Sequence, residues 1–246
     1  MPTLVMLHGL FGHLHVPEIE AEYVGWDLCA PDLMGYGTYA DSNTSHLSLS
    51  DQVEHVIGFI EALGSDRVHL LGHSVGGAVA MLVAHRRPDL LKSLCTVEGN
   101  FTLKDAFWSA KIAETDDAEV EAIVQGYRQD PDAWMAGAID EPSDLTRRLA
   151  REWLDNQPAS TIKAQARAVV DATTPKNYLS DLRAVLESDL PVHLIAGSRS
   201  ADGWDVPRWA NNLCATRFNI PRTGHLMMVE NPKAFAKAVQ TAIDFG

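Results

Sequence analysis

The sequence predicts an α/β protein with a mostly parallel sheet of about six strands, helices on both faces and an inserted helical cap. Short apolar runs that favour β structure alternate with amphipathic helical stretches near both ends of the chain. A long middle segment, about residues 101–186, carries helical patterns and no convincing strand. The 246 residues are enough for one large domain that carries such an insertion.

Six apolar runs predict the strands of this sheet. They are Thr3–Leu7, Tyr23–Ala30, Val68–Leu71, Leu94–Val97, Val192–Ala196 and Thr216–Ile220. Three helices are predicted around them, at Leu49–Leu63, Val75–Arg87 and Pro232–Phe245. Because strands that are joined by helices run parallel, we expect a core of residues 1–100 and 187–246 and a cap of residues 101–186.

Composition and charge exclude several classes of partner. The net charge of −13, with no local cluster of Lys and Arg, would repel nucleic acid and anionic lipid, so we expect a small-molecule substrate and neither nucleic acid nor membrane. The three cysteines, Cys29, Cys95 and Cys214, form no metal-binding or disulfide pattern. We therefore expect no metal and no cofactor. We also expect a cytoplasmic location, since no signal peptide and no apolar run of ~20 residues is present. The expected oligomeric state is a monomer or a homodimer.

The strongest local signal is the segment Gly72–Gly77, which reads Gly-His-Ser-Val-Gly-Gly. It lies directly between a predicted strand and a predicted helix, where a sharp turn needs small neighbours. Such a turn presents the Ser74 hydroxyl above the sheet, next to a helix N-terminus that favours developing negative charge. The segment therefore predicts a nucleophilic serine.

A serine hydroxyl needs a base that takes its proton during attack. His225 lies between the last predicted strand and the last predicted helix, in a loop expected at the same edge of the sheet as Ser74. Its position and the order serine before histidine suit this chemistry. Other histidines, namely His69, His85 and His193, fall inside predicted strands or helices and are interpreted as structural.

Together these motifs resemble the α/β-hydrolase superfamily. The matching segments follow one another from residue 7 to residue 232: Leu7-His8-Gly9, Asp32–Gly37, Gly72–Gly77, Gly224-His225 and Glu230-Asn231-Pro232. Most members of the superfamily have two further strands before the first one here. The resemblance implies an oxyanion hole from the N–H groups of Leu10, or alternatively Phe11, and Val75, whereas His8 holds the loop.

The acid that orients His225 is left open between three carboxylates. The superfamily often has an Asp three residues after the glycine that ends the penultimate strand, but here Ser200 stands there. Asp202 and Asp205 follow closely. Some members carry the acid at the end of the strand that follows the nucleophile helix, where this chain has Glu98, and we favour Glu98.

The cap is expected to determine specificity. Its aromatic and sulfur-containing residues, together with Phe11 and two methionines beside His225, either line an apolar pocket over Ser74 or pack the cap and core themselves. These residues are Phe107, Trp108, Trp134, Met135, Trp153, Met227 and Met228. Substrate-binding roles are predicted for Phe11, Trp108, Trp134 and Met227.

The sequence thus predicts a serine hydrolase that cleaves a small carboxylic ester or lactone through an acyl-enzyme intermediate. Ser74 attacks, His225 moves the proton, and Glu98 orients the imidazole. Two alternatives share these residues. One is a hydrolase or lyase that acts on carbon–carbon bonds, and the other is a hydrolase-like receptor for a small molecule.

Overall fold

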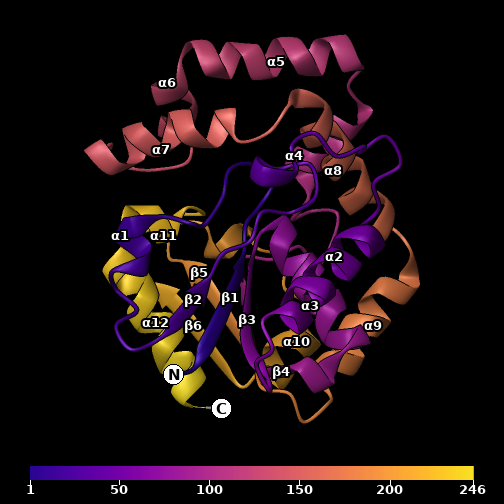
Figure 1. Cartoon of the computed structure of the whole chain (residues 1–246), viewed down its shortest axis with the longest axis vertical. Helices are drawn as coiled ribbons and strands as arrows, with labels where there is room; N and C mark the ends of the chain where they lie inside the picture. The colour runs from indigo at the N-terminus through magenta and orange to yellow at the C-terminus, as the bar shows by residue number, and fades with distance from the viewer. Residues whose placement is uncertain (246) are drawn as a thin grey trace.

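One sheet of six parallel strands, in the order β2-β1-β3-β4-β5-β6, forms the centre of the protein (Figure 1). The computed structural model describes residues 1–245, with every side chain among them except those of Phe107 and Lys176. The strands are β1 (Thr3–Leu7), β2 (Asp27–Cys29), β3 (Val68–His73), β4 (Leu91–Val97), β5 (Val192–Gly197) and β6 (Thr216–Ile220). The predicted parallel sheet is confirmed.

Helices cover both faces of the sheet. One face is covered by α2 (Leu49–Ala62), α3 (Val75–Arg86), α9 (Lys176–Leu186) and α10 (Arg208–Leu213). The other face is covered by α1 (Pro17–Glu20), α11 (Met227–Glu230) and α12 (Pro232–Asp244). Short 3₁₀ turns lie at Gly37–Tyr39, Pro88–Leu90 and Ala201–Gly203. No helix among the described residues has the length and apolar character needed to cross a bilayer.

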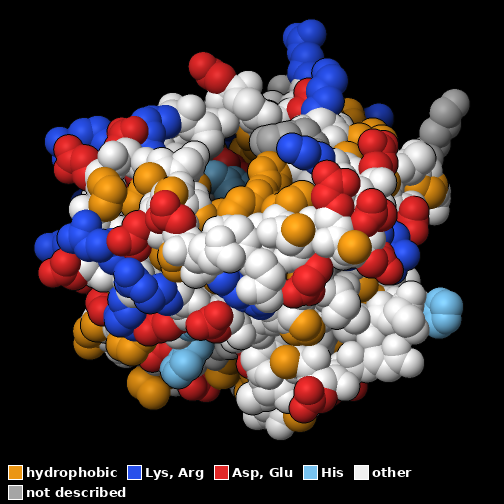
Figure 2. Space-filling model, turned by 90° about the horizontal axis from the view of Figure 1, so that it is seen from above, with side chains coloured by type: hydrophobic (Ala, Val, Ile, Leu, Met, Phe, Trp, Pro, Cys, Tyr) orange, Lys and Arg blue, Asp and Glu red, His pale blue; other side chains and the backbone are white. Residues whose placement is uncertain are grey.

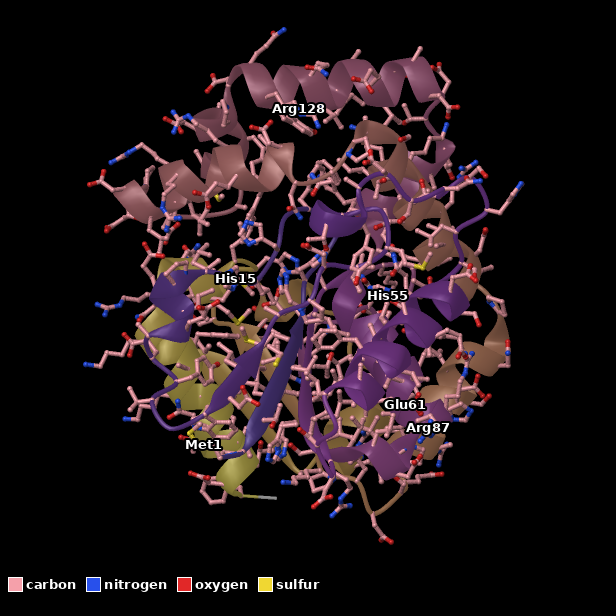
Figure 3. All side chains as sticks on the ribbon, viewed as in Figure 1. Met1, His15, His55, Glu61, Arg87 and Arg128 are labelled. Atoms are coloured by element: carbon pink, nitrogen blue, oxygen red, sulfur yellow. The ribbon has the colours of Figure 1, made fainter. Side chains whose placement is uncertain are left out.

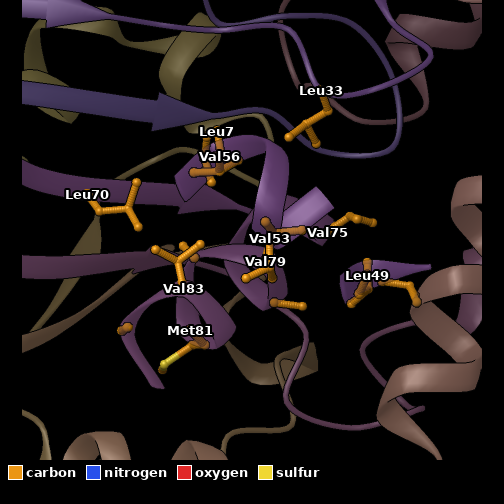
Figure 4. Close-up of a cluster of buried hydrophobic side chains, with 14 of the residues drawn as sticks. Leu7, Leu33, Leu49, Val53, Val56, Leu70, Val75, Val79, Met81 and Val83 are labelled. Carbon is orange, nitrogen blue, oxygen red and sulfur yellow. The ribbon is translucent and has the colours of Figure 1, made fainter. Parts of the chain in front are cut away.

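The core is divided into two layers by the sheet. Successive side chains of a strand point to opposite faces, so Leu70 joins the layer under α2 and α3, and Leu71 joins the layer under α12. Figure 4 shows the first layer, in which Val56 of α2 and Val79 of α3 meet strand residues such as Leu70. Because both faces are buried, the strands read as continuous apolar runs.

The segment between β4 and β5 is helical, as its sequence predicts. Its helices are α4 (Phe107–Glu114), α5 (Asp117–Gln129), α6 (Pro131–Ala136), α7 (Asp144–Asp155), α8 (Ala159–Thr173) and α9. In Figure 1, α5, α6 and α7 lie above the carboxyl ends of the strands, whereas α9 packs against α3 at the side of the sheet. The division into a core and a cap at residues 101 and 186 stays a prediction.

Some boundaries differ from those that the sequence predicts. Of the run Tyr23–Ala30, only Asp27–Cys29 pairs in the sheet. Gly25 has a φ of +84°, and the buried Tyr23 ring packs against Trp26, so the first half of this run forms a turn that fills the core. The short helices α1, α10 and α11 were not predicted, because four to six residues show too little periodicity.

Candidate active site

The chain passes from β3 to α3 through a sharp turn at Ser74. Its backbone has φ 53° and ψ −120°, a conformation that non-glycine residues adopt only where the surroundings enforce it. The flanking glycines allow very close approach: a Cβ on Gly72 would lie 2.2 Å from the Gly76 carbonyl oxygen, and one on Gly77 would lie 2.5 Å from Gly99 Cα. Larger residues would not fit, so the turn at Ser74 depends on these glycines.

Glu98 and His225 are in direct contact. The Nδ1 atom of His225 lies 2.7 Å from Glu98 Oε2, and the Glu98 side chain is only 5% exposed. Since a carboxylate accepts, Nδ1–H of the neutral ring donates this bond, and Nε2 is left without a proton. The imidazole therefore has the tautomer that a general base needs.

Glu98 is held by several groups around it. It follows the last residue of β4 with a φ of +43°, and its Oε1 accepts hydrogen bonds from Gly197 N at 2.8 Å and Ser200 Oγ at 2.5 Å. Burial raises the pKa of Glu98, but the hydrogen bonds from His225, Ser200 and Gly197 and the positive charge that His225 can carry together outweigh it and hold the pKa below its ordinary value. The side chain is therefore a carboxylate at neutral pH.

The two other candidate acids lie elsewhere. Asp202 is exposed, and Asp205 accepts a hydrogen bond from Thr102 Oγ1 at 2.8 Å. The structure brings Glu98 to His225 and brings neither of these aspartates there. Ser200, at the position where the superfamily often has the acid, donates a hydrogen bond to Glu98.

His225 lies beside the residue that precedes Ser74. The centroids of the His73 and His225 rings are 4.5 Å apart, and His73 Nε2–H donates to the His225 carbonyl oxygen at 3.0 Å. Burial keeps the pKa of His73 well below its ordinary value, so this ring stays neutral. The His225 loop is held further by Glu230, which accepts from Gly224 N at 2.6 Å and pairs with Arg199. The His225 ring remains 42% exposed.

The loop after β1 lies against His73 and Ser74. A Cβ on Gly9 would be 3.2 Å from Ser74 Cβ and 3.2 Å from His73 Nδ1. His8 holds this loop as expected: its Nδ1–H donates to Gly9 O at 2.9 Å, and its Nε2 accepts from Leu33 N at 3.1 Å. Burial lowers the pKa of His8 to about 4, which agrees with a neutral ring in that position.

The expected oxyanion donors have no acceptor among the described residues. None of the hydrogen bonds found there uses the backbone N–H of Leu10, Phe11 or Val75. In a trans peptide the N–H points opposite to the C=O, and the Gly9 and Leu10 carbonyls are bonded to His8 and to the Tyr36 hydroxyl. The N–H groups of Leu10 and Phe11 are therefore directed away from the core.

Three of the predicted substrate-binding residues form one aromatic cluster. Phe11 lies 5.5 Å from Trp108 and 5.3 Å from Trp134, measured between ring centroids. Tyr127, which the sequence analysis did not single out, contacts all three rings. Seen from the cap side, the protein has a hollow with hydrophobic side chains on its rim and floor (Figure 2).

The remaining candidates are placed differently. Met227 and Met228 are fully buried, and Met135 and Trp153 are nearly so; all four belong to the cluster of buried hydrophobic residues that includes the apolar side of α12. These positions favour packing over contact with a ligand. The side chain of Phe107 lies outside the described residues. No group of three or more His, Cys, Asp and Glu side chains among the described residues is arranged to hold a metal ion.

Three residues of the site were missed. His73 stands at a position of the Ser74 turn where the motif accepts any residue, and Ser200 only marks the place where the superfamily often has an aspartate. Tyr127 is the one aromatic residue of the amphipathic helix α5. The one available signal was Tyr127 as an isolated aromatic residue in α5. The contacts of His73 and Ser200 are made to residues more than 100 positions away.

The chain is similar in sequence to several known proteins. Over 215 residues it is 26% identical to an uncharacterized protein of Mycobacterium tuberculosis (strain ATCC 25618 / H37Rv), which covers 80% of this chain and 61% of that protein. It is 25% identical to a putative carbamate hydrolase of Caulobacter sp. (strain K31), covering 96% of this chain and 88% of the relative. It is 28% identical to a 2-succinyl-6-hydroxy-2,4-cyclohexadiene-1-carboxylate synthase of Enterobacter sp. (strain 638), and the match covers 96% of this chain and 89% of the relative.

A solved structure shows the same fold. It comes from work on carboxylesterases of the thaumarchaeon Nitrososphaera gargenis, and it superposes with a TM-score of 0.77 at 19% identity, covering 99% of this chain and 90% of that one. The model of the alpha/beta hydrolase family matches residues 4–238. The chain therefore belongs to the α/β-hydrolase family.

Proposed function

We propose that this protein is a serine hydrolase that cleaves a small carboxylic ester or lactone through an acyl-enzyme. The observation that carries the proposal is the contact between His225 Nδ1 and the buried Glu98 carboxylate, at the strand ends where the Ser74 turn also lies. A histidine held in this tautomer beside a strained serine is the arrangement that activates a hydroxyl.

The first half of the reaction transfers the acyl group to the enzyme. Ser74 Oγ attacks the carbonyl carbon while His225 Nε2 takes the hydroxyl proton, and the carbonyl oxygen becomes an oxyanion. The N–H groups of Leu10 and Val75 stabilise this oxyanion. The tetrahedral intermediate then collapses, the bond to the alcohol oxygen breaks, and His225 returns the proton to that oxygen.

The second half releases the acid. Water gives a proton to His225 and attacks the acyl carbon, and collapse of the second tetrahedral intermediate restores the Ser74 hydroxyl. Throughout, the Glu98 carboxylate stabilises the positive imidazole, and burial strengthens this interaction because little water screens it. Apart from the substrate and this water, the scheme uses only side chains and backbone of this chain.

The aromatic cluster supports an apolar portion in the substrate. Phe11, Trp108, Tyr127 and Trp134 connect the loop beside Ser74 with α4, α5 and α6 above it. Aromatic rings contribute a large apolar contact area with little loss of conformational entropy. We therefore propose that the acyl or alcohol group carries a hydrocarbon or aromatic part.

The Ser74→Ala variant tests the proposal. We expect hydrolysis of p-nitrophenyl acetate to fall by at least about 10³-fold and labelling by a fluorophosphonate probe to be lost, since both need the hydroxyl. The control is Ser180→Ala, because Ser180 is an exposed serine on α9. Full activity in Ser74→Ala would exclude the proposal. Slow labelling of the wild type, together with release of only about one equivalent of p-nitrophenol from p-nitrophenyl acetate, would favour the receptor alternative.

A second candidate is cleavage or elimination at a carbon–carbon bond. It is favoured by the similarity to a protein named 2-succinyl-6-hydroxy-2,4-cyclohexadiene-1-carboxylate synthase, which extends over 96% of this chain. A panel of aryl esters, lactones and ring-fission diketones would separate the two candidates. A kcat/KM for a diketone that exceeds the values for all esters and lactones would favour this second candidate.

A further inference from the structure

The oxyanion loop is held from two sides. On the core side, the Gly9 carbonyl accepts from His8 and the Leu10 carbonyl accepts from the buried Tyr36 hydroxyl at 2.9 Å. On the other side, the Gly12 peptide groups are held by two consecutive residues between α7 and α8, namely Asn156 and Gln157. The four bonds orient four consecutive peptide groups.

Gln157 holds the far end of this loop through both ends of its side chain. Its Oε1 accepts from Gly12 N at 3.1 Å, and its Nε2 donates to the Trp153 carbonyl oxygen at 2.8 Å. The side chain is 1% exposed, so these bonds are made away from water. Asn156 adds a bond from its Nδ2 to the Gly12 carbonyl oxygen at 3.0 Å.

The loop has almost no freedom between these attachments. Only Phe11 separates the Leu10 carbonyl, held by the core, from the Gly12 N–H, held by Gln157. Gly12 itself has a φ of +80° and lies against the Trp153 ring, which a Cβ at this position would approach to 2.3 Å. A shift of the Gly12 peptide would therefore rotate the Phe11 and Leu10 peptides.

The junction of α7 and α8 is in turn held by α5. Arg128 donates from Nη2 to the Gln157 carbonyl oxygen at 2.8 Å and from Nε to the Leu154 carbonyl oxygen at 3.1 Å. Figure 3 shows Arg128 below α5. The helices above the sheet are thus connected by hydrogen bonds to the loop beside Ser74.

We propose that Gln157, together with Asn156, is a positioning residue that keeps the Leu10 N–H directed at the oxyanion. The inference rests on the proposed function, because only acyl chemistry at Ser74 needs this donor. Loss of one oxyanion donor costs roughly 10²–10³-fold in kcat. A displaced donor costs less, so we expect a fall of at least about 10-fold.

Gln157→Met tests the inference, because Met has nearly the same length and neither accepts nor donates these bonds. We expect kcat for p-nitrophenyl acetate, per site titrated with the fluorophosphonate probe, to fall by about 10-fold or more with KM changed by less than about twofold. Inhibition by phenylboronic acid, which forms a tetrahedral adduct with the serine, should weaken by a similar factor.

The matched control is Gln165→Met. Gln165 is also fully buried and accepts from Gln52 Nε2 at 2.7 Å, but it lies in α8 and makes no bond to the loop. Both variants are expected to lose similar stability, whereas only Gln157→Met loses kcat. If Gln157→Met folds poorly, Asn156→Ala is the second variant, since Asn156 is partly exposed; we expect at least about a threefold fall in kcat.

Two results would overturn the inference. One is a kcat per titrated site within twofold of wild type in both Gln157→Met and Asn156→Ala. The other is an equal fall in kcat in Gln165→Met, which would indicate that replacing any buried glutamine lowers kcat. Failure of the proposed function is distinguishable, because Ser74→Ala would then remain active whatever the result at Gln157.

Discussion

Ser74 and Glu98 share an unusual backbone conformation. Both have positive φ values, 53° and 43°, and both directly follow the last residue of a strand in the middle of the sheet. A non-glycine residue in such a conformation costs about 1–3 kcal/mol, which the surrounding structure must supply. Among the described residues the one other non-glycine residue with a positive φ is Arg222, at 58°, three positions before His225. At the scale of single residues, backbone strain thus lies at or close to the proposed nucleophile, acid and base.

The variant Glu98→Gln tests the role of the acid. Gln keeps the size of the side chain but removes the charge that stabilises the imidazolium. Because Gly197 N and Ser200 Oγ would hold its amide oxygen, its NH2 group would face His225 Nδ1, and this donor selects the wrong tautomer. We expect kcat for p-nitrophenyl acetate to fall by roughly 10²–10⁴-fold. Asp202→Asn, at an exposed carboxylate nearby, is the control and should change kcat by less than about twofold. Wild-type rates in Glu98→Gln would contradict the assignment.

The unit formed by β3, the Ser74 turn and α3 depends on close backbone contacts. Gly76 lies so near the loop after β1 that a Cβ would be 2.4 Å from the His8 carbonyl oxygen. Gly77 meets Gly99, which follows Glu98. At the scale of elements, the glycines let α3 approach two neighbouring strand ends, and so they bring the serine and the acid to one place.

A pair of glycine substitutions separates this effect from helix propensity. Gly77→Ala places a Cβ 2.5 Å from Gly99 Cα, so the backbone must shift; we expect about 1–3 kcal/mol lower stability and reduced kcat. Gly58→Ala is the control. Gly58 lies on an exposed position of α2 with nothing within 4 Å, and alanine should raise stability by about 0.5–1 kcal/mol.

Urea unfolding of both variants measures these changes. Alanine is expected to lower the free energy of unfolding at position 77 and to raise it at position 58, because only the Cβ at position 77 meets backbone atoms. Equal stabilisation at both sites would show that the close contact at Gly77 is not limiting.

At the scale of the whole molecule, buried histidines make stability depend on pH. His193 of β5 is fully buried, and its Nδ1 lies 2.8 Å from Thr216 Oγ1. Burial lowers its pKa to about 4, and the same cause lowers the pKa of His8 to about 4. In the unfolded chain such a ring takes up a proton near pH 6.5.

Stability should therefore be greatest above pH 6.5 and fall as the pH decreases from 6.5 to 4, because the unfolded state binds more protons in this range. Over the interval from pH 6.5 to 5 each ring contributes roughly 1–2 kcal/mol of this loss. Urea unfolding at a series of pH values measures it. His193→Leu should show a smaller loss than wild type, whereas an unchanged slope would contradict the assignment. The lowered pKa of Glu98 also reduces stability as the pH falls, but mainly below about pH 4.5, so the interval from pH 6.5 to 5 reports chiefly on the histidines.

Much of the core was predictable from local patterns. The runs Thr3–Leu7 and Thr216–Ile220 form strands with the predicted bounds, and the predicted helix at Leu49–Leu63 differs by one residue from α2. These elements are long or strongly patterned, so their own residues determine them. Tyr23–Ala30 was different, because a turn that buries Tyr23 overrode the β preference of its first half.

By itself, the sequence determined the α/β fold, the strand-turn-helix around Ser74 and the position of His225 after the last strand. Each depends on periodicity or on a short motif, which neighbouring residues establish. Only the tertiary structure brought Glu98, rather than Asp202 or Asp205, to His225, brought Tyr127 to Phe11, and placed Gln157 at Gly12. These contacts join residues 116 to 145 positions apart, and such contacts depend on how distant segments of the chain pack rather than on local preference.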